Sequence, residues 1–355
     1  MEEKKRIGVL TGGGDCPGLN AVIRAVVKKA YTEGFEPVGF KDGWKGPLLL
    51  WETSPEGQML PLVIDPLMPE HISGIIEKGG TILGSSRTNP ADEEKGLERV
   101  IKNLEKLKID SFISIGGEDT LSVAVKLSVM GVKIVGVPKT IDNDVGGTEA
   151  CIGFHTAVQT AMEAIDKIRD TAESHHQIMI IEVMGRHFGW IATFAGLAAG
   201  ADFILIPEES FNLGRLLKSI EKRRAQGKRF SLIVISEGVN LGEGLAIAKE
   251  KLDAFGHKKL GGVGQRLAEI LEEKTGSETK AENFGRLSRG GSPTAFDRIL
   301  ATRFGVKAVE LIKKGKFGRM VAFRNGKIVD VALEKALCQR KVDHDVWKCA
   351  KLFFS

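Results

Sequence analysis

A stretch near the middle of the chain, residues 111–148, concentrates residue types that handle phosphate groups. A short apolar run there ends at a glycine pair, residues 116–117, and Glu118 and Asp119 follow at the start of a helical pattern. A glycine turn before a helix directs backbone N–H groups and the positive end of the helix dipole towards one point. This arrangement predicts a binding site for an anion such as phosphate.

Two aspartates follow the next predicted strand of the same stretch. Asp142 and Asp144 come shortly after Lys139 and Thr140. Carboxylates beside a phosphate site require a cation, and Mg²⁺ is the usual one because it takes hard oxygen ligands and bridges to phosphate. One aspartate is then left over, and a carboxylate can accept the proton of a hydroxyl that attacks phosphorus. The stretch therefore predicts phosphoryl transfer to a hydroxyl group.

Two loops in the first hundred residues offer further phosphate contacts. Three glycines at 12–14 separate a predicted strand, 5–10, from a helix over about 20–33, and they let the backbone approach an anion closely. The spacing fits neither GxGxxG nor GxxxxGK[ST], so a plain strand-to-helix turn is the alternative. Small residues around Arg87 favour a loop that offers a guanidinium to a phosphate, with a solvated arginine as the alternative.

The second half of the chain repeats the pattern of a polar group at the end of a strand. A predicted strand over 177–183 is followed by Gly185 and Arg186 at the start of a helix. Another predicted strand, 230–236, ends at Glu237. A carboxylate at the carboxyl end of a buried strand is well placed to hold a sugar hydroxyl.

Strand and helix patterns alternate along the chain, which predicts an α/β fold with a parallel sheet covered on both faces in each half. The length of 355 residues fits two compact domains better than one. Asn325-Gly326 between apolar runs predicts a hairpin. We expect surface structure over residues 43–69, a short helix over 71–78 and a polar, glycine-punctuated connection over 240–263.

Composition excludes several classes of protein. The net charge is only +5 and the basic residues are spread along the chain, so we expect no nucleic-acid partner. The four cysteines form no CxxC pair and no zinc spacing, which favours free thiols in a reducing, cytoplasmic compartment. The N-terminus lacks the apolar region of a signal peptide, and no apolar run is long enough to span a membrane.

Taken together, seven motifs in a fixed order resemble those of the 6-phosphofructokinase family over about residues 6–330. They are GGGDCPGLNA (12–21), GSSR (84–87), GGEDT (116–120), PKTIDND (138–144), EVMGRHFGW (182–190), ISEG (235–238) and RGGSP (289–293). The resemblance implies two Rossmann-like α/β domains with mainly parallel sheets and an active site in the interdomain cleft. A donor-binding domain would comprise residues 1–150 plus 290–316, and a sugar-phosphate-binding domain residues 151–289 plus 317–355.

The resemblance also implies a role for each matched residue. Asp142 would be the general base on the 1-hydroxyl of fructose 6-phosphate, and Glu118 and Asp144 would stand near Mg²⁺. The catalytic set would be Asp142, Thr140, Lys139 and Arg186. The donor-binding set would be Gly13, Arg87, Asp119 and Lys139. The sugar-phosphate set would be Thr140, Asp142, Asp144, Met184, Gly185, Arg186, Glu237, Lys280, Arg286 and Arg289.

Two positions favour pyrophosphate as the phosphoryl donor. ATP-using members typically carry glycine where Asp119 and Lys139 stand, whereas diphosphate-using members resemble this chain. The Asp119 carboxylate would repel the α-phosphate of ATP, and Lys139 would pair with the terminal phosphate of pyrophosphate. We therefore expect reversible Mg²⁺-dependent transfer from pyrophosphate to fructose 6-phosphate in glycolysis or gluconeogenesis. The alternatives are ATP as donor, another acceptor such as sedoheptulose 7-phosphate, or a catalytically silent subunit.

The resemblance implies a homodimer or homotetramer, since the family closes its sugar site with residues of a neighbouring subunit. Gln177 stands where an arginine of the neighbour usually reaches the 6-phosphate. Lys280 and Arg286 stand at two further phosphate-binding positions that are commonly arginine and histidine. The pocket keeps its cationic character, so these departures concern the identity of the sugar phosphate more than the reaction.

Overall fold

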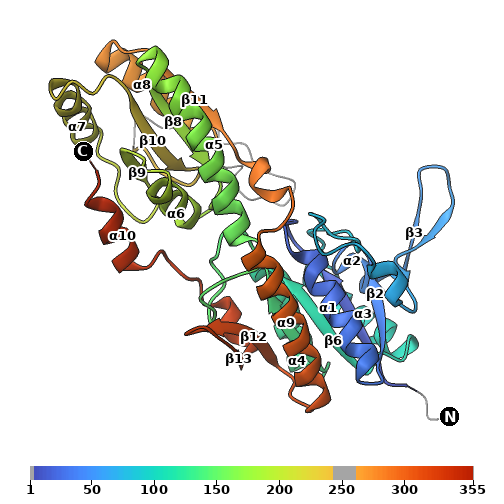
Figure 1. The fold of residues 1–355 in the computed structure, drawn as a ribbon. Coiled ribbons are helices and arrows are strands. Elements are labelled where there is room, and N and C mark those ends of the chain that lie inside the picture. The colour runs from blue at the N-terminus through green and yellow to red at the C-terminus, as the bar shows by residue number, and fades with distance from the viewer. Residues whose placement is uncertain (1–3, 243–260, 355) are drawn as a thin grey trace. The chain divides into compact units, whose positions relative to one another are not determined.

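The structure is a computed structural model that describes residues 4–242 and 261–354 (Figure 1). The chain forms two compact units, Met1–Thr156 with Arg289–Arg340 and Ala157–Ser288 with Lys341–Ser355, called here the first and the second unit. Most of the connection expected over residues 240–263 lies outside the described residues. No helix within the described ranges is both long and apolar enough to cross a membrane.

The first unit is built on a seven-stranded sheet. Its strands, in spatial order, are β13 (Lys327–Ala332), β12 (Arg319–Arg324), β7 (Ile134–Pro138), β6 (Ser111–Gly116), β1 (Arg6–Thr11), β2 (Glu36–Phe40) and β5 (Val63–Ile64). Neighbouring strands run parallel except at the two edges, where β13 and β5 pair antiparallel with β12 and β2. The central strands are buried on both faces, which accounts for their largely apolar sequences.

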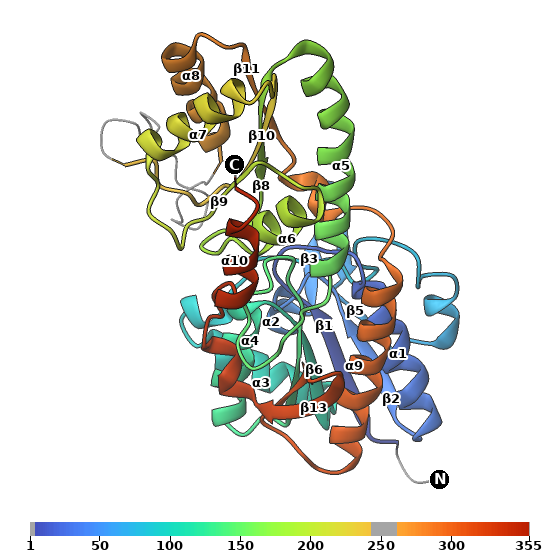
Figure 2. The same ribbon diagram turned by 60° about the vertical axis from the view of Figure 1, so that its left-hand side comes forward.

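Helices cover both faces of this sheet (Figure 2). On one face α1 (Leu19–Thr32) packs against α9 (Ala295–Lys313), and on the other lie α3 (Gly96–Lys106) and α4 (Glu118–Val129). Because β1 pairs with both β2 and β6, the direction of the crossovers reverses beside β1. Right-handed crossovers then place α1 and α4 on opposite faces. Loops at the carboxyl ends of β1 and β6 separate at this point, which is where open α/β sheets bind ligands.

The second unit contains a four-stranded, fully parallel sheet. Its order is β11 (Thr279–Asn283), β8 (Ile178–Val183), β10 (Ser231–Ser236) and β9 (Phe203–Leu205). The accompanying helices are α5 (Phe154–His175), α6 (Trp190–Ala198), α7 (Leu213–Ala225), α8 (Val263–Thr275) and α10 (His344–Lys351). The prediction of a parallel sheet in each half is confirmed.

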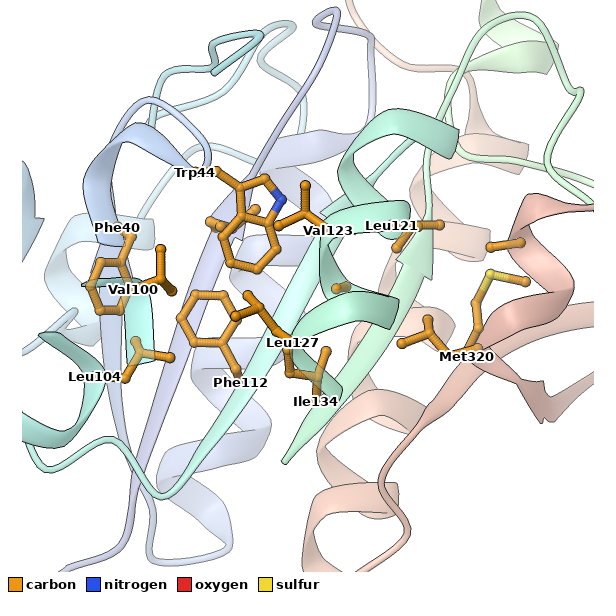
Figure 3. Packing of buried hydrophobic residues seen from close by; sticks show 14 of the residues in the cluster. Phe40, Trp44, Val100, Leu104, Phe112, Leu121, Val123, Leu127, Ile134 and Met320 are labelled. Atoms are coloured by element: carbon orange, nitrogen blue, oxygen red, sulfur yellow. The ribbon is translucent and has the colours of Figure 1, made fainter. Parts of the chain in front are cut away.

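Two local expectations were wrong. Residues 43–69 are not only surface structure, because Trp44 is 2% exposed and stacks on Phe112 with ring centroids 5.6 Å apart (Figure 3). The segment comprises short elements with little periodicity: α2 (Lys45–Leu49), β3 (Trp51–Thr53), β4 (Met59–Pro61) and β5. The helix expected over 71–78 is only a 3₁₀ turn, Pro69–Ile72. Ser73 is extended and Gly74 has a φ of 63°, so the helical conformation ends there although Ile72, Ile75 and Ile76 have helical spacing.

The boundary between the units also differs from the expected one. Residues 317–340, assigned from the resemblance to the second domain, belong to the first unit together with Arg289. The reason is strand pairing: β12 runs parallel to β7, with Arg319 opposite Val135, and so extends the first sheet. The hairpin at Asn325-Gly326 is confirmed, and both residues adopt the positive φ that a tight hairpin turn requires.

Candidate functional site

The glycine loop after β1 is held from two sides. The Gly12 N–H donates to the carbonyl of Ile115 at 2.9 Å, and the Gly13 N–H donates to that of Ser86 at 3.1 Å. Gly13 has a φ of 80°, a left-handed conformation that suits glycine. The loop is thereby fastened to the end of β6 and to the segment that carries Arg87, which is itself exposed.

Side chains lie close to two glycines of this loop. A Cβ at Gly12 would lie 2.7 Å from side-chain atoms of Thr120, and a Cβ at Gly14 would lie 1.8 Å from Nη1 of Arg289. Arg289 also donates a 3.4 Å hydrogen bond to the Asp15 carbonyl. Arg289, expected at the sugar phosphate, therefore lies against the glycine loop of the first unit.

Lys139 lies beneath the same loop. Its side chain is 2% exposed, and Nζ donates to the carbonyl of Gly12 at 2.9 Å and to that of Gly14. Burial lowers the pKa of the ammonium, Cys16 opposes this, and the guanidinium of Arg289 lowers it further. The glycine loop thus packs on the buried Lys139 side chain, and its neutral carbonyls accept hydrogen bonds from Nζ.

The N-terminal turn of α4 carries its own negative charge. Glu118 is half-buried and Asp119 exposed, and both lie in this first turn, where acidic side chains interact favourably with the helix dipole. Glu118 accepts a 2.8 Å hydrogen bond from Nε2 of Gln339. A phosphate that approached this helix start would meet two carboxylates, so a cation is needed to accompany it.

The turn after β7 presents Asp142 in a defined position. The Thr140 N–H donates to the Ile152 carbonyl at 3.2 Å, and the Asp142 N–H donates to Oγ1 of Thr140 at 3.1 Å. Asn143 has a φ of 52° and accepts the Cys151 N–H at 2.9 Å. Asp142 is consequently held in a rigid turn with only 6% of its surface exposed.

Gln339 and Arg340 also contact the candidate site, and no sequence motif indicated them. Gln339 contacts Glu118, while the Arg340 N–H donates to the Asp144 carbonyl at 2.8 Å and its guanidinium donates to that of Glu149. No local pattern marks them, because they follow a 3₁₀ turn, Leu333–Leu337, almost two hundred residues after the aspartates. This C-terminal segment of the first unit connects the residues expected to bind metal.

The residues fit a metal ion that arrives with its substrate. Glu118 and Asp144 are half-buried and follow neighbouring strands, β6 and β7. Among the described residues no group of three or more His, Cys, Asp or Glu side chains forms a metal cage. Mg²⁺ commonly uses one or two carboxylates together with substrate phosphates and water, so two carboxylates suffice.

In the second unit, the ends of β8 and β10 bring three expected residues together. The Arg186 N–H donates to Oε1 of Glu237 at 3.2 Å, and the Glu237 N–H donates to the Val183 carbonyl at 2.9 Å. Gly185 has a φ of 154°, and a Cβ there would lie 2.4 Å from the Phe188 carbonyl oxygen. Met184, which precedes this glycine, is half-buried.

Lys280 does not join this group. It lies opposite Met179 in the sheet, four residues before the end of β8 at Val183. At about 3.3 Å per residue that separation is about 13 Å. Lys280 instead forms an exposed ion pair with Glu278 at 3.4 Å, while Arg286 begins the 3₁₀ turn Arg286–Arg289 beyond the opposite end of β11.

The comparisons agree with this fold and these motifs. Residues 6–312 match the family model described as phosphofructokinase. The chain belongs to the phosphofructokinase family. A solved structure of a pyrophosphate-dependent phosphofructokinase from Marinobacter aquaeolei has a TM-score of 0.78 at 25% identity and covers 99% of this chain and 92% of its own. Both the expected family and its α/β fold are confirmed.

Relatives within the phosphofructokinase family carry names for two phosphoryl donors. The chain is 50% identical over 352 residues to a pyrophosphate–fructose 6-phosphate 1-phosphotransferase of Amycolatopsis methanolica, covering 98% of this chain and 99% of that one. It is 47% identical over 334 residues to ATP-dependent 6-phosphofructokinase 3 of Streptomyces coelicolor, covering 94% of each. Overall sequence identity therefore does not distinguish pyrophosphate from ATP as the donor.

Proposed function

We propose that this protein transfers a phosphoryl group from pyrophosphate to the 1-hydroxyl of fructose 6-phosphate with Mg²⁺, giving fructose 1,6-bisphosphate and phosphate reversibly. The observation that carries the proposal is Lys139, buried against the carbonyls of Gly12 and Gly14. An ammonium with neutral partners gains a charge-assisted hydrogen bond when a phosphate replaces them. The homologue from Amycolatopsis methanolica, with pyrophosphate in its name, is consistent with this donor.

The chemistry is assigned to the turn after β7. Asp142 accepts the proton of the 1-hydroxyl while the hydroxyl oxygen forms a bond to the terminal phosphorus of pyrophosphate. The bond from that phosphorus to the bridging oxygen breaks, and phosphate leaves. Lys139 and Arg87 bind the donor oxygens, and Thr140 binds the sugar. Mg²⁺, held by Glu118 and Asp144, would neutralise phosphate charge when bound.

The sugar is assigned to the strand ends of the second unit. The Glu237 carboxylate binds sugar hydroxyls, and Met184, Gly185 and Arg186 form the adjoining wall. The hydrogen bond from the Arg186 backbone N–H to the Glu237 carboxylate supports this assignment, since it brings the loop after β8 against a hydroxyl acceptor at the end of β10. Arg286 and Arg289 are assigned to the sugar phosphate, although Arg289 equally suits a phosphate at the glycine loop.

Lys280 and Gln177 are assigned to the site of a second copy of the chain in a homo-oligomer. The distance of about 13 Å along β8 supports this, because Lys280 cannot serve the strand ends of its own sheet. Both residues line a surface cavity of about 540 Å³.

Subunit complementation tests this arrangement. Chains with Asp142→Asn and chains with Lys280→Ala are co-expressed with different tags, and mixed oligomers are purified on both tags. One site of the mixed oligomer then has a native base and a native neighbouring lysine, so activity should exceed that of either parent. Mixed oligomers no more active than the parents, or a fully active monomer in light scattering, contradict the proposal.

Parallel assays test the donor. Fructose 6-phosphate and Mg²⁺ are offered with pyrophosphate or with ATP, and kcat/KM is measured for each. We expect pyrophosphate to be preferred, and a preference for ATP would overturn the assignment. ATP is the second candidate because named ATP-dependent relatives reach 47% identity. Sedoheptulose 7-phosphate replaces fructose 6-phosphate in a third arm.

A further inference from the structure

A cavity of about 340 Å³ lies in the second unit among β9, α7 and α10. None of the residues assigned above to the donor, the sugar or the metal lines it. Its volume is in the range of small-molecule sites, which are typically about 300–1,000 Å³. The cavity therefore has room for a ligand that the proposed reaction does not use.

Aromatic rings form one wall of this cavity. Phe354 lies 5.6 Å from Trp347 with the rings edge to face, and 6.3 Å from Phe203 on β9. All three rings line the cavity. Aromatic rings at these separations leave faces and edges that accept a further flat ring in stacked or edge-to-face geometry.

Cations also line the cavity. Arg215, Lys218 and Lys222 line the cavity from α7, and their spacing of three and four residues puts them on one helix face. Lys351 lines it from α10, with its Nζ 5.6 Å from the centre of the Trp347 ring.

Glu209, the acidic residue of the cavity lining, already accepts hydrogen bonds from two neighbours. Oε1 of Glu209 accepts the Trp347 indole N–H at 2.6 Å and the Lys351 ammonium at 3.0 Å. These two hydrogen bonds, that of Lys351 first, lower the pKa of Glu209, so the carboxylate stays charged and held in place. Since this single carboxylate is the acidic group among four cations, the lining of the cavity is strongly positive.

We propose that this cavity binds a small aromatic molecule that carries one strongly acidic group. The ring packs against Trp347 and Phe354, and the phosphate, sulfonate or carboxylate group faces Lys218 and Lys222. Such a ligand connects the C-terminal helix α10 to α7. The combination of an apolar wall with a few convergent charges is typical of sites that select both the body and the head of a ligand.

Two dyes with nearly the same rings test the proposal. Anilinonaphthalene sulfonate carries the acidic group, and N-phenylnaphthylamine lacks it; both fluoresce on entering an apolar site. Each is titrated into the full chain with saturating fructose 6-phosphate and, separately, with saturating pyrophosphate. We expect the sulfonate to bind once per chain under both conditions. If either substrate displaces it, the dye occupies the proposed catalytic site and the inference fails.

Variants then locate the dye. Lys218→Gln with Lys222→Gln should weaken sulfonate binding roughly twofold to fivefold for each lysine and leave the uncharged dye unchanged. Phe354→Ala should weaken both dyes. The matched controls are Lys341→Gln with Lys348→Gln and Leu352→Ala, exposed side chains outside the cavity lining, which should change neither. Equal dissociation constants in all variants would overturn the inference, whatever the donor of the reaction proves to be.

Discussion

The ammonium of Lys139 donates a 2.9 Å hydrogen bond to the carbonyl of Gly12, 127 residues earlier in the chain. The bond joins the turn after β7 to the loop after β1, two strands that are separated in the sheet by β6. It therefore couples the position of the glycine loop to the turn that carries Asp142. A phosphate that binds Lys139 must compete with this carbonyl and with that of Gly14.

Asp142→Asn should lower kcat by roughly 10²- to 10⁴-fold, the usual cost of losing a general base. Binding of fructose 6-phosphate should remain, because asparagine keeps the shape of the side chain in its rigid turn. Steady-state kinetics and calorimetric titration with the sugar measure the two effects. Asp144→Asn is the matched control and should chiefly raise the Mg²⁺ concentration that activity requires. A near-normal kcat for Asp142→Asn would place the base elsewhere.

The donor preference should depend jointly on Asp119 and Lys139. Lys139→Gly should lower kcat/KM for pyrophosphate by about one to two powers of ten, since a charge-assisted hydrogen bond is worth about 1.5–3 kcal/mol. Asp119→Gly should weaken pyrophosphate use and admit ATP poorly. The double variant should use ATP better than the single changes predict, because neighbouring substitutions are rarely additive.

The measurement is kcat/KM for both donors in all four proteins, at fixed Mg²⁺ and saturating fructose 6-phosphate. Unfolding curves for each variant separate a change of donor from a loss of structure. An unchanged preference for pyrophosphate in the double variant would place the selectivity in other residues.

The value of kcat/KM for pyrophosphate should fall as pH rises. The fall should begin at a lower pH than it would for a lysine of ordinary pKa. Burial lowers the pKa of Lys139, so the ammonium loses its proton, and with it the attraction for phosphate, as pH rises through this lowered pKa. Below that pH the charge is present and kcat/KM is unaffected by this group. Lys139→Arg retains its charge and should move the fall to higher pH, which pH profiles of the two proteins compare. If the pH profiles of the native protein and Lys139→Arg coincide at alkaline pH, Lys139 does not titrate in the reaction.

Two tryptophans of one segment should differ sharply in their contribution to stability. Trp44→Ala removes a side chain that stacks on Phe112 and donates to the Thr120 carbonyl at 3.0 Å, and should cost about 3–5 kcal/mol. Trp51 is 51% exposed, and Trp51→Ala should stay within about 0.5 kcal/mol. Urea unfolding followed by circular dichroism measures both. Equal losses would mean that Trp44 is not part of the core.

The four thiols should react in two classes. Cys338 and Cys349 are exposed, whereas Cys16 and Cys151 are buried. Burial raises the pKa of Cys16 to about 12 and raises that of Cys151 as well, so neither supplies thiolate at neutral pH. A thiol reagent at pH 8 should modify two cysteines in the native protein and four after denaturation. Rapid modification of Cys16, identified by mass spectrometry, would contradict the burial of this thiol.

Local patterns in the sequence were enough to predict the main strands and the polar residues at their ends. A strand, a glycine turn and a helix start each leave a pattern among neighbouring residues. Asp119, Asp142 and Arg186 could therefore be placed after the carboxyl ends of strands without a structure. Parallel pairing then puts such ends at one edge of a sheet, and the contact between Arg186 and Glu237 follows from it. The hairpin at Asn325-Gly326 was equally local, since two residues determine its turn.

Tertiary structure alone decided which distant residues complete these groups. Gln339 reaches Glu118 across 221 residues, Arg289 packs on the glycine loop, and Trp44 enters the core from a segment without periodicity. Periodicity records only which side of its own helix or strand a residue occupies. Whether two such sides meet depends on strand order and on the packing of the whole sheet. That order placed β12 beside β7, and with it brought the C-terminal segment of the first unit to the carboxylates that follow β6 and β7.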